Sequence, residues 1–315
     1  ISTSVINDGK KNILGLGNVF IVDKNINLDV DFNLDDFDLS FLSSFGKNKV
    51  NRIQGIVSGN LNLWGSLSDI KLKGKTTINK GNLYLPITNT EYKIRDKTPI
   101  FFQDQSIRFI NTELLDSYEK TVATANGNLF HKNFKDWGID LDVTSKRLLL
   151  FNRTKNLESR FYGKGFLNGR ASFKGPFKSV NLSVSGVTAD GTNIVIPWQE
   201  NKGLSDTSFI DFVPKSQNEE KESVYKISSF DEQFRGFEMV FDLDITREAE
   251  LEIVVDQKSG STLSGRGNGK ILIETNNDGK FNIFGDYVTY DGTYNFKNLG
   301  LIDKKFIVKP GGSII

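Results

Sequence analysis

The sequence contains no cysteine. Disulfides, iron–sulfur clusters and the usual thiolate zinc sites are therefore excluded. A chain without cysteine is compatible with the oxidising compartment of a cell envelope. Chemistry that depends on a thiol has no place in this protein.

Histidine is almost as scarce, because His131 is the only one. A lone histidine without cysteine provides neither a Ser–His–Asp triad nor a transition-metal site, since both need further partners or ligands. We interpret His131, which lies beside an expected turn, as a structural residue. The composition therefore predicts no metal site.

Motifs for phosphate binding and for acid–base chemistry are also missing. Residues 74–76 (Gly-Lys-Thr) resemble the end of a phosphate loop, but the glycine that such a loop needs five positions earlier is Asp69. The glycines at 265–269 precede no expected helix, so they form no dinucleotide fingerprint. Asp140 and Asp142 alternate with apolar residues on the polar side of an expected strand, where no apolar pocket raises a carboxyl pKa. We therefore expect no catalytic residue and no enzyme.

Long hydrophobic runs and an excess of one charge are absent too. No apolar run approaches the ~18 residues of a transmembrane helix. The first residues, ISTSVINDGKKN, show no charged segment followed by an apolar one, so no signal peptide is visible. We expect the chain to be a fragment of a longer protein whose targeting segment lies outside it. The 40 basic and 39 acidic side chains alternate and leave a charge of +1, so the basic stripe that nucleic acid requires is missing.

What the sequence does contain is strand and turn chemistry. It has 25 Phe and many Ile, Leu and Val, with only 6 Pro, and β-branched and aromatic residues favour strands. In residues 26–34 every even position is apolar and every odd one is Asn or Asp. In a strand this alternation gives one apolar and one polar face, whereas a helix would scatter the same residues around its circumference. The sequence therefore predicts an all-β fold.

The same alternation recurs along most of the chain. It is found at 59–65, 70–78, 83–86, 139–143, 180–184, 194–197, 239–245, 249–255, 270–273 and 281–283. Turn signals such as Asn-Asp-Gly and Asp-Gly separate many of these segments. A spacing of roughly 8–12 residues between turns is typical of a meander of hairpins.

Two stretches interrupt the pattern. Residues 104–126 are predicted to form either a short helical turn or an irregular crossing. Residues 199–236 are highly charged and lack a period, so we expect a solvated or disordered insertion in which 208–213 docks as an edge strand. The prediction is one continuous domain, with a first part at 1–198, the insertion at 199–236 and a C-terminal part at 237–315.

Glycines stand inside the expected strands as well as at turns, for example at 55, 59, 65, 74, 163, 165, 169 and 175. Such glycines allow bends and close backbone approach, and their recurrence favours a sheet folded sharply along its length. Bulges scattered through an ordinary two-sheet sandwich are an alternative of equal weight. Roughly twenty strands ~4.8 Å apart would extend ~90–100 Å, which is too long for one compact core.

Several stretches, taken in order, resemble the C-terminal part of TamB proteins in a version typical of the Bacteroidetes. They are Ile56–Gly74 running on to Gly81–Pro86, Gly127–Phe134, Phe161–Gly169 with Ala189–Thr192, and Phe284–Phe296 leading into Lys305–Ile314. Each is ordinary strand–turn–strand sequence, but their order covers most of the chain. The insertion at 199–236 and the lack of the family's final strands after Ile315 depart from the family pattern.

The resemblance implies an elongated, twisted β-taco, which is a U-shaped sheet with a continuous apolar groove. It implies an envelope protein of the AsmA-like, bridge-type lipid-transfer superfamily in a Gram-negative bacterium. Such a protein is anchored in the inner membrane through a segment outside this chain and spans the periplasm toward an outer-membrane barrel of the TamA/BamA class. The resemblance also implies a role in outer-membrane protein and autotransporter assembly or secretion.

We expect the acyl chains of phospholipids to fill the groove, because an empty apolar face of that length is costly in water at ~25 cal/mol per Å². No covalent bond breaks in such a conduit, so no cofactor is expected. One rival is a scaffold that takes up outer-membrane protein segments at its strand edges by β-addition, and another is a surface adhesin or secreted β-sandwich. The expected groove-lining residues are Leu28, Val30, Phe32, Leu61, Leu63, Leu83, Leu85, Ile139, Leu141, Val143, Leu167, Leu182, Val184, Ile194, Ile196, Met239, Phe241, Leu243, Ile245, Leu251, Ile253, Val255, Ile271, Ile273, Phe281 and Ile283.

Overall fold

The computed structural model describes residues 2–7, 10–22, 24–40, 51–86, 88–155, 161–197, 237–276, 281–298, 302–311 and 313–314. Within these ranges the chain is all-β and contains no helix, which confirms the predicted fold class. The predicted insertion at 199–236, with its expected edge strand at 208–213, lies outside the described residues.

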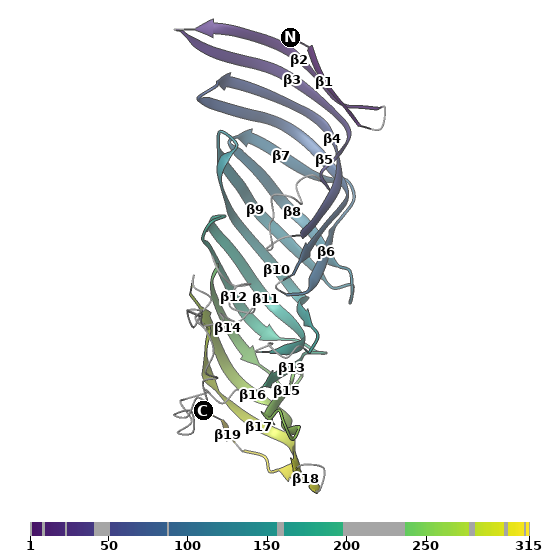
Figure 1. The fold of residues 1–315 in the computed structure, drawn as a ribbon, viewed down its shortest axis with the longest axis vertical. Helices are drawn as coiled ribbons and strands as arrows, with labels where there is room; N and C mark the ends of the chain where they lie inside the picture. The colour runs from purple at the N-terminus through teal and green to yellow at the C-terminus, as the bar shows by residue number, and fades with distance from the viewer. Residues whose placement is uncertain are drawn as a thin grey trace, which may run out of the picture.

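The strands follow one another along the chain as a meander (Figure 1). They are β1 (Ser2–Asn7), β2 (Lys10–Val22), β3 (Asn25–Asp38), β4 (Asn51–Ser66), β5 (Asp69–Leu85), β6 (Thr90–Ile94), β7 (Thr98–Asp104), β8 (Ser106–Asp116), β9 (Val122–Lys132), β10 (Lys135–Arg153), β11 (Tyr162–Pro176), β12 (Val180–Thr188), β13 (Asn193–Pro197), β14 (Phe237–Ile245), β15 (Glu250–Asp256), β16 (Ser261–Thr275), β17 (Phe281–Asn298), β18 (Ile302–Val308) and β19 (Ser313–Ile314).

All of these strands belong to a single 19-stranded sheet, rather than to the two sheets of a sandwich. Figure 1 shows them stacked along the long axis of the molecule, with β1 and β2 at one end and β18 at the other. The described pairs are antiparallel, except that β12 pairs with β14 and β13 with β15 in parallel. Parallel neighbours need a long connection between them, and the chain between β13 and β14 has that length.

A line of strand breaks, here called the elbow, divides the sheet into two limbs. Residues 72–78 of β5 pair with β7 and residues 82–85 pair with β6, so β6 and β7 are halves of one strand position broken at 95–97. β12 and β13 are separated in the same way at 189–192, and β14 and β15 at 246–249. Figure 1 shows β6, β13 and β15 on one side of the molecule and β7, β12 and β14 on the other.

Where a strand passes the elbow without a break, its register shifts. Bulges lie at 109–112 in β8, at 145–148 in β10 and at 289–291 in β17, opposite residues 266–267 of β16. A bulge bends the strand and increases its twist. Asn111 adopts φ 48° here, and its N–H donates to the Asn126 side chain at 2.7 Å. The elbow is thus a backbone feature, and side chains satisfy groups that the ladder no longer pairs.

Glycine is required where neighbouring strands approach most closely. Gly127 in β9 adopts φ +147°, and a Cβ at that position would lie 2.1 Å from the Asp140 carbonyl oxygen of β10. Gly163 in β11 has φ +115°, and its Cβ would lie 2.1 Å from the Asn193 carbonyl oxygen of β13. No side chain fits at that distance, so these glycines permit a close approach of backbones.

The hairpin of β8 and β9 corrects one prediction. Residues 104–126 form no helical turn and no irregular crossing, but two strands and the turn between them. The fully buried Asp116 carboxylate closes this turn, because it accepts the N–H groups of Tyr118 (2.9 Å), Glu119 (2.8 Å) and Thr121 (2.6 Å). The bulge in β8 breaks the alternation by which the strand would be recognised from sequence.

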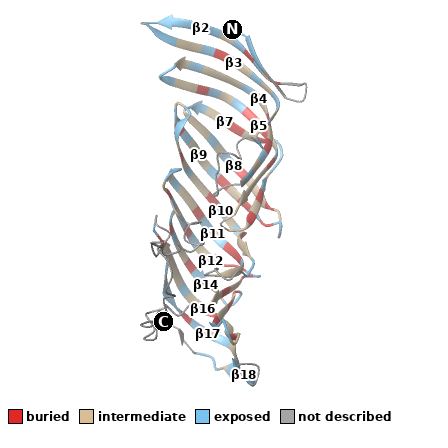
Figure 2. Cartoon of the chain, viewed as in Figure 1, coloured by how far each residue is buried: buried red, intermediate tan, exposed pale blue. Residues whose placement is uncertain are grey.

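The sheet is long and thin rather than globular. Because broken strands share positions, the sheet is shorter than twenty strands would make it, about 65–70 Å at ~4.8 Å per position. Figure 2 shows buried residues in short patches within the strands, separated by intermediate and exposed ones. Much apolar surface therefore stays partly open to solvent.

Candidate functional site

The candidate site is the apolar face of the sheet, defined here by two clusters of packed hydrophobic side chains. The larger cluster runs from β8 to β17 and the smaller from β3 to β8. The buried members of the larger cluster are Ala123, Ala125, Val143, Leu167, Ala171, Val184, Leu243, Ile245, Ala249, Leu251 and Tyr287, and those of the smaller are Val57, Ile78 and Ile100. Together the clusters extend along most of the sheet.

Strand alternation places these side chains on one face. In β12 the buried Val180 and Val184 and the half-buried Leu182 alternate with exposed Asn and Ser residues. Neighbours in register continue the face across the ladder, where Leu182 pairs with Met239 and Val184 with Phe241 of β14. The period-2 pattern of each strand and the register between strands therefore combine into one apolar surface.

The larger cluster takes side chains from both limbs. Leu182 in β12 lies on one side of the elbow, and Ile194 and Ile196 in β13 lie on the other, yet all three pack against the larger cluster. Leu243 in β14 and Leu251 in β15 stand in the same relation. The larger cluster therefore continues across the elbow from one limb to the other.

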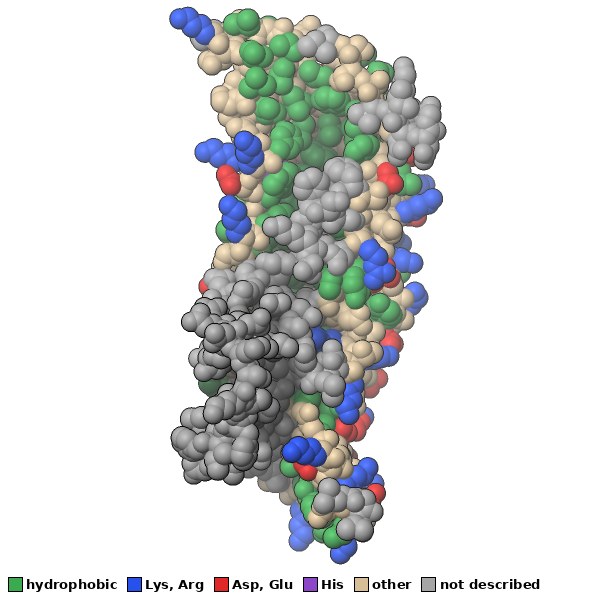
Figure 3. Space-filling model, in the orientation of Figure 1, with side chains coloured by type: hydrophobic (Ala, Val, Ile, Leu, Met, Phe, Trp, Pro, Cys, Tyr) green, Lys and Arg blue, Asp and Glu red, His purple; other side chains and the backbone are tan. Residues whose placement is uncertain are grey.

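The apolar face is only partly closed. Cluster members such as Phe102, Phe241 and Ile271 remain half-buried. Figure 3 shows hydrophobic side chains gathered in a band along the hollowed face over the N-terminal strands, with Lys and Arg side chains at its margins. At ~25 cal/mol per Å², this open apolar area leaves a driving force for contact with a further apolar partner.

The predicted lining residues differ in burial. Buried are Val30, Val143, Leu167, Val184, Met239, Leu243, Ile245 and Leu251, and half-buried are Leu28, Phe32, Leu61, Leu63, Leu83, Leu85, Ile139, Leu141, Leu182, Ile194, Ile196, Phe241, Ile253, Ile271 and Ile273. The larger cluster brings together Leu141, Val143, Leu167, Leu182, Val184, Ile194, Ile196, Phe241, Leu243, Ile245, Leu251 and Ile271. The other predicted side chains of the described part are not members of either cluster, and the side chains of Phe281 and Ile283 lie outside that part.

Among the predicted lining residues whose side chains are described, Val255 is the exposed one. The register of β15 shifts between Val254 and Asp256, so that Val254 is 7% exposed and Val255 is 41% exposed. A bulge reverses the alternation of faces beyond it. Strict alternation in the sequence therefore does not hold at the end of β15.

Two groups of buried residues were not predicted. Ala123 and Ala125 of β9 belong to the larger cluster, and their Ala-x-Ala spacing is the signal that a search for large apolar residues misses. Leu149, Phe166 and Ala189 form a separate small cluster at the elbow. No sequence signal identifies this group, because the bulge in β10 shifts the alternation there.

The opposite face of the sheet is polar and carries ion pairs between strands. Arg170 of β11 and Asp142 of β10 lie 2.7 Å apart, and Lys270 of β16 and Asp242 of β14 lie 3.2 Å apart. The hydrogen bond from Arg170 lowers the pKa of the Asp142 carboxyl below its ordinary value. The Asp142 carboxyl therefore stays ionised near neutral pH, which suits solvation of this face rather than proton transfer.

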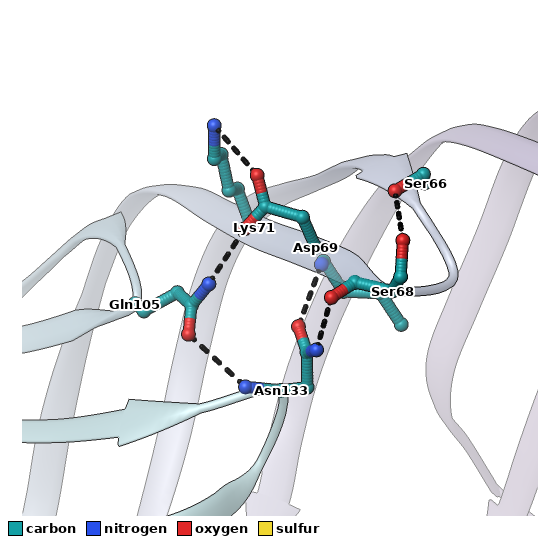
Figure 4. A network of polar contacts seen from close by, with 7 residues as sticks. Ser66, Ser68, Asp69, Lys71, Gln105 and Asn133 are labelled. Carbon is teal, nitrogen blue, oxygen red and sulfur yellow. Dashed lines mark hydrogen bonds and ion pairs between the residues drawn. The ribbon is translucent and has the colours of Figure 1, made fainter.

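Three neighbouring hairpin turns are tied together along one rim of the sheet, in what we call the rim network (Figure 4). The Asn133 side chain of the β9–β10 turn donates to the Ser68 carbonyl oxygen and accepts the Ile70 N–H at 2.9 Å, so it reaches the β4–β5 turn. Gln105 of the β7–β8 turn donates to Asp69 at 2.8 Å and accepts the Asn133 N–H at 3.0 Å. These bonds supplement the sheet ladder and fix the positions of the turns at this rim.

His131, close to the rim network, is 6% exposed. Its ring centroid lies 4.6 Å from those of Phe134 and Trp137. Its Nδ1 atom accepts the Phe134 N–H at 3.1 Å. Burial lowers the pKa of His131 below its ordinary value, so the ring is neutral near neutral pH and packs as an aromatic group.

Neither a metal centre nor a membrane-spanning helix is found in the described ranges. Nowhere in them do three His, Asp or Glu side chains gather as potential metal ligands. In the same ranges, no helix has the length and apolar character needed to cross a membrane.

Comparison with known proteins yields a family match. The family model described as the TamB C-terminal domain matches residues 111–315, which is well over half of the chain. The matched range contains most of the larger apolar cluster and ends at the last strand. No curated protein and no solved structure matches the chain.

Proposed function

This chain belongs to the TamB family, and from that premise we propose that its sheet is a passive conduit for the acyl chains of phospholipids. Membership carries a role in the translocation and assembly module of the cell envelope. In our proposal the sheet is a β-taco whose limbs enclose a groove along the apolar face, while lipid head groups stay at its open side. No covalent bond is made or broken, so the protein is not an enzyme and needs no cofactor.

The larger apolar cluster is the observation that supports this proposal. It crosses the elbow and runs without interruption from β8 to β17. Those strands occupy eight positions in the sheet, which at ~4.8 Å each give a length of roughly 35 Å. The hydrocarbon core of a bilayer is ~30 Å thick, so the cluster offers acyl chains an apolar environment of comparable extent. The opposite, ion-paired face keeps the outside of the conduit in water.

We further propose a place for this conduit in the cell. The protein is anchored in the inner membrane through a segment outside this chain, extends through the periplasm, and meets an outer-membrane barrel of the TamA/BamA class. The elongated single sheet supports this arrangement, because a bridge between membranes needs length rather than a compact core.

Native mass spectrometry of the purified 315-residue chain, followed by lipid extraction, tests the proposal. Phospholipids that accompany the folded protein and leave on extraction would support the conduit. A folded, elongated protein that carries no lipid, even after incubation with phospholipid vesicles, would overturn it. Solution scattering on the same sample establishes the elongated shape in either case.

A scaffold for outer-membrane protein assembly is the second candidate, and the exposed apolar side chains of β18 favour it. Among the described strands β18 pairs only with β17, and its Ile307 is 85% exposed. An open strand edge accepts a further strand by β-addition. Leu182→Glu on the apolar face should impair lipid binding and spare strand addition, whereas Ile307→Asp should do the reverse. Calorimetry with a peptide from a barrel strand, beside the lipid assay, separates the two functions.

A further inference from the structure

An open pocket of about 660 Å³ lies at the elbow and is distinct from the apolar face. Asn168 and Asn268 line it, and both are exposed, whereas the preceding residues Leu167 and Gly267 are buried. Successive residues of a strand point to opposite faces. The cavity therefore opens on the polar face, opposite the proposed lipid path. We call it the elbow cavity.

The elbow cavity exists because strands break there. The segment 189–192 follows β12 and the segment 246–249 follows β14, and the two segments lie side by side. Two hydrogen bonds join them at their ends, from the Thr246 N–H to the Thr188 hydroxyl at 2.9 Å and from the Glu250 N–H to the Thr192 carbonyl oxygen at 2.9 Å. These bonds hold the two connections next to each other. The side chains that follow the breaks thus surround a common space rather than continuing the ladder.

Charges of both signs line the elbow cavity. Lys146, Arg147 and Arg247 are the cations, and Asp190 and Glu248 are the carboxylates. Within the described part of the chain, no ion pair involves any of these five side chains. The opposite charges elsewhere on this face do pair, as in Arg170 with Asp142. The unpaired charges of the elbow cavity are therefore available to a ligand.

Both arginines are held in place by aromatic rings. The Arg147 guanidinium lies 3.9 Å from the Phe166 ring centroid, and its Nε donates to the Asp190 carbonyl oxygen at 3.1 Å. The Arg247 guanidinium lies 3.5 Å from the Tyr290 ring centroid. A stacked guanidinium keeps its N–H edges free in a fixed orientation, which is the arrangement that binds oxyanions in two-pronged fashion.

We propose that the elbow cavity binds a small phosphate ester that also carries an ammonium group. The two arginines and Lys146 hold the phosphate group. Three cations are more than a ligand with one carboxylate would require, and they suit a phosphate group, which carries up to two negative charges. Asp190 and Glu248 hold the ammonium group, whereas an anion without an amine would be repelled by them. The cavity offers about twenty times the ~30 Å³ of a water molecule, which is room for both groups. The site lies on the face opposite the apolar one, so it and the lipid conduit can fail independently.

Isothermal titration calorimetry of the 315-residue chain with O-phosphoethanolamine tests the proposal. Ethyl phosphate and ethanolamine serve as the two halves of the probe. We expect O-phosphoethanolamine to bind at least about tenfold more tightly than either half, because only it engages both sets of charges. No binding at millimolar concentration would overturn the proposal, and so would ethyl phosphate binding as tightly as the complete probe.

Two surface variants and a matched control assign the site. Arg247→Gln and Glu248→Gln should each weaken binding at least about tenfold. Lys174→Gln removes a charge from the same polar face outside the cavity, where Lys174 lies 3.7 Å from Asp140, and should bind as the wild type does. Equal affinities for Arg247→Gln and Lys174→Gln, with both folded by circular dichroism, would overturn the assignment.

The ligand chemistry has two sources, a free phosphate ester or a lipid head group. Sedimentation with vesicles of phosphatidylethanolamine and of phosphatidylglycerol distinguishes them. Selective binding to the first, lost in Arg247→Gln, assigns the site to a lipid head group. Binding of the free compound without binding to either vesicle assigns it to a soluble ester. Both results support the chemistry proposed for the elbow cavity.

Discussion

A charge on the apolar face should stop lipid binding without unfolding the sheet, and Leu182→Glu tests this most directly. Leu182 packs against the larger cluster and pairs in register with Phe173 of β11 and Met239 of β14. Its side chain is half-buried. Full burial of a leucine is worth ~1.5–3 kcal/mol, so losing this half-buried one should cost about 1–1.5 kcal/mol of folding stability. The sheet should survive that loss.

The expected effect on lipid is larger than the effect on folding. A carboxylate keeps its hydration water, because an unpaired buried charge is very unfavourable. Acyl methylenes next to it therefore lose their apolar contact. With ~0.8 kcal/mol for each methylene, the loss of three or four amounts to about 2.5–3 kcal/mol. That corresponds to a roughly 100-fold drop in lipid occupancy, at ~1.4 kcal/mol for each factor of ten.

The matched control introduces the same charge at the next residue. Ser183 is exposed on the polar face of β12, so Ser183→Glu should bind lipid as the wild type does. Native mass spectrometry measures the bound lipid, and transfer of a fluorescent phospholipid between vesicles measures conduction. The reasoning fails if folded Leu182→Glu retains wild-type lipid, or if Ser183→Glu loses as much lipid as Leu182→Glu.

Three further predictions concern the elements that support the site. Gly127→Val should destabilise the sheet by about 2–4 kcal/mol in urea unfolding, since a Cβ there lies 2.1 Å from the Asp140 carbonyl oxygen. The pKa of His131 in the folded protein lies below its ordinary value. The contribution of neutral His131 to folding stability is therefore complete above pH ~6.5 and is lost as the pH falls through the folded pKa. Urea unfolding should therefore show a lower stability at pH 5 than at pH 7.5. This difference between the two pH values should be smaller in His131→Gln. Asn133→Ala should cost about 1–2 kcal/mol and speed amide hydrogen exchange in the β4–β5 turn.

Each of these predictions has its own control. Gly260→Asn places a side chain where nothing lies within 4 Å and φ is +76°, which Asn tolerates, so it should be nearly neutral. A wild-type pH dependence in His131→Gln would show that other groups cause it. Ser66→Ala removes a hydrogen bond that stays within one turn, so it should leave amide hydrogen exchange unchanged. If Asn133→Ala also leaves the exchange unchanged, the rim network does not restrain the β4–β5 turn.

The strands themselves were largely predictable. The alternation in residues 26–34 corresponds to β3, and the one in residues 139–143 lies within β10. The prediction failed at β8, where a bulge interrupts the alternation. A bulge adds one residue to the backbone, and no residue type announces it reliably. Sequence periodicity therefore holds between bulges and breaks down at them.

The sequence alone determined the fold class and the existence of an apolar face. Both depend on the local geometry of a strand, in which every second side chain points to the same side, so the order of residues suffices. Residue types and their spacing likewise exclude thiol, phosphate-loop and triad chemistry.

Only the tertiary structure decided where the sheet bends and what the bend brings together. Val184 meets Phe241 across a parallel pair, and Lys146 shares a cavity with Arg247, although long stretches of chain separate the members of each pair. Such contacts depend on which strands pair and on where bulges and breaks align in neighbouring strands. These are properties of the assembled sheet and of no single segment. The elbow, the apolar cluster that crosses it and the charged cavity on the polar face therefore come from strand pairing, which periodicity does not encode.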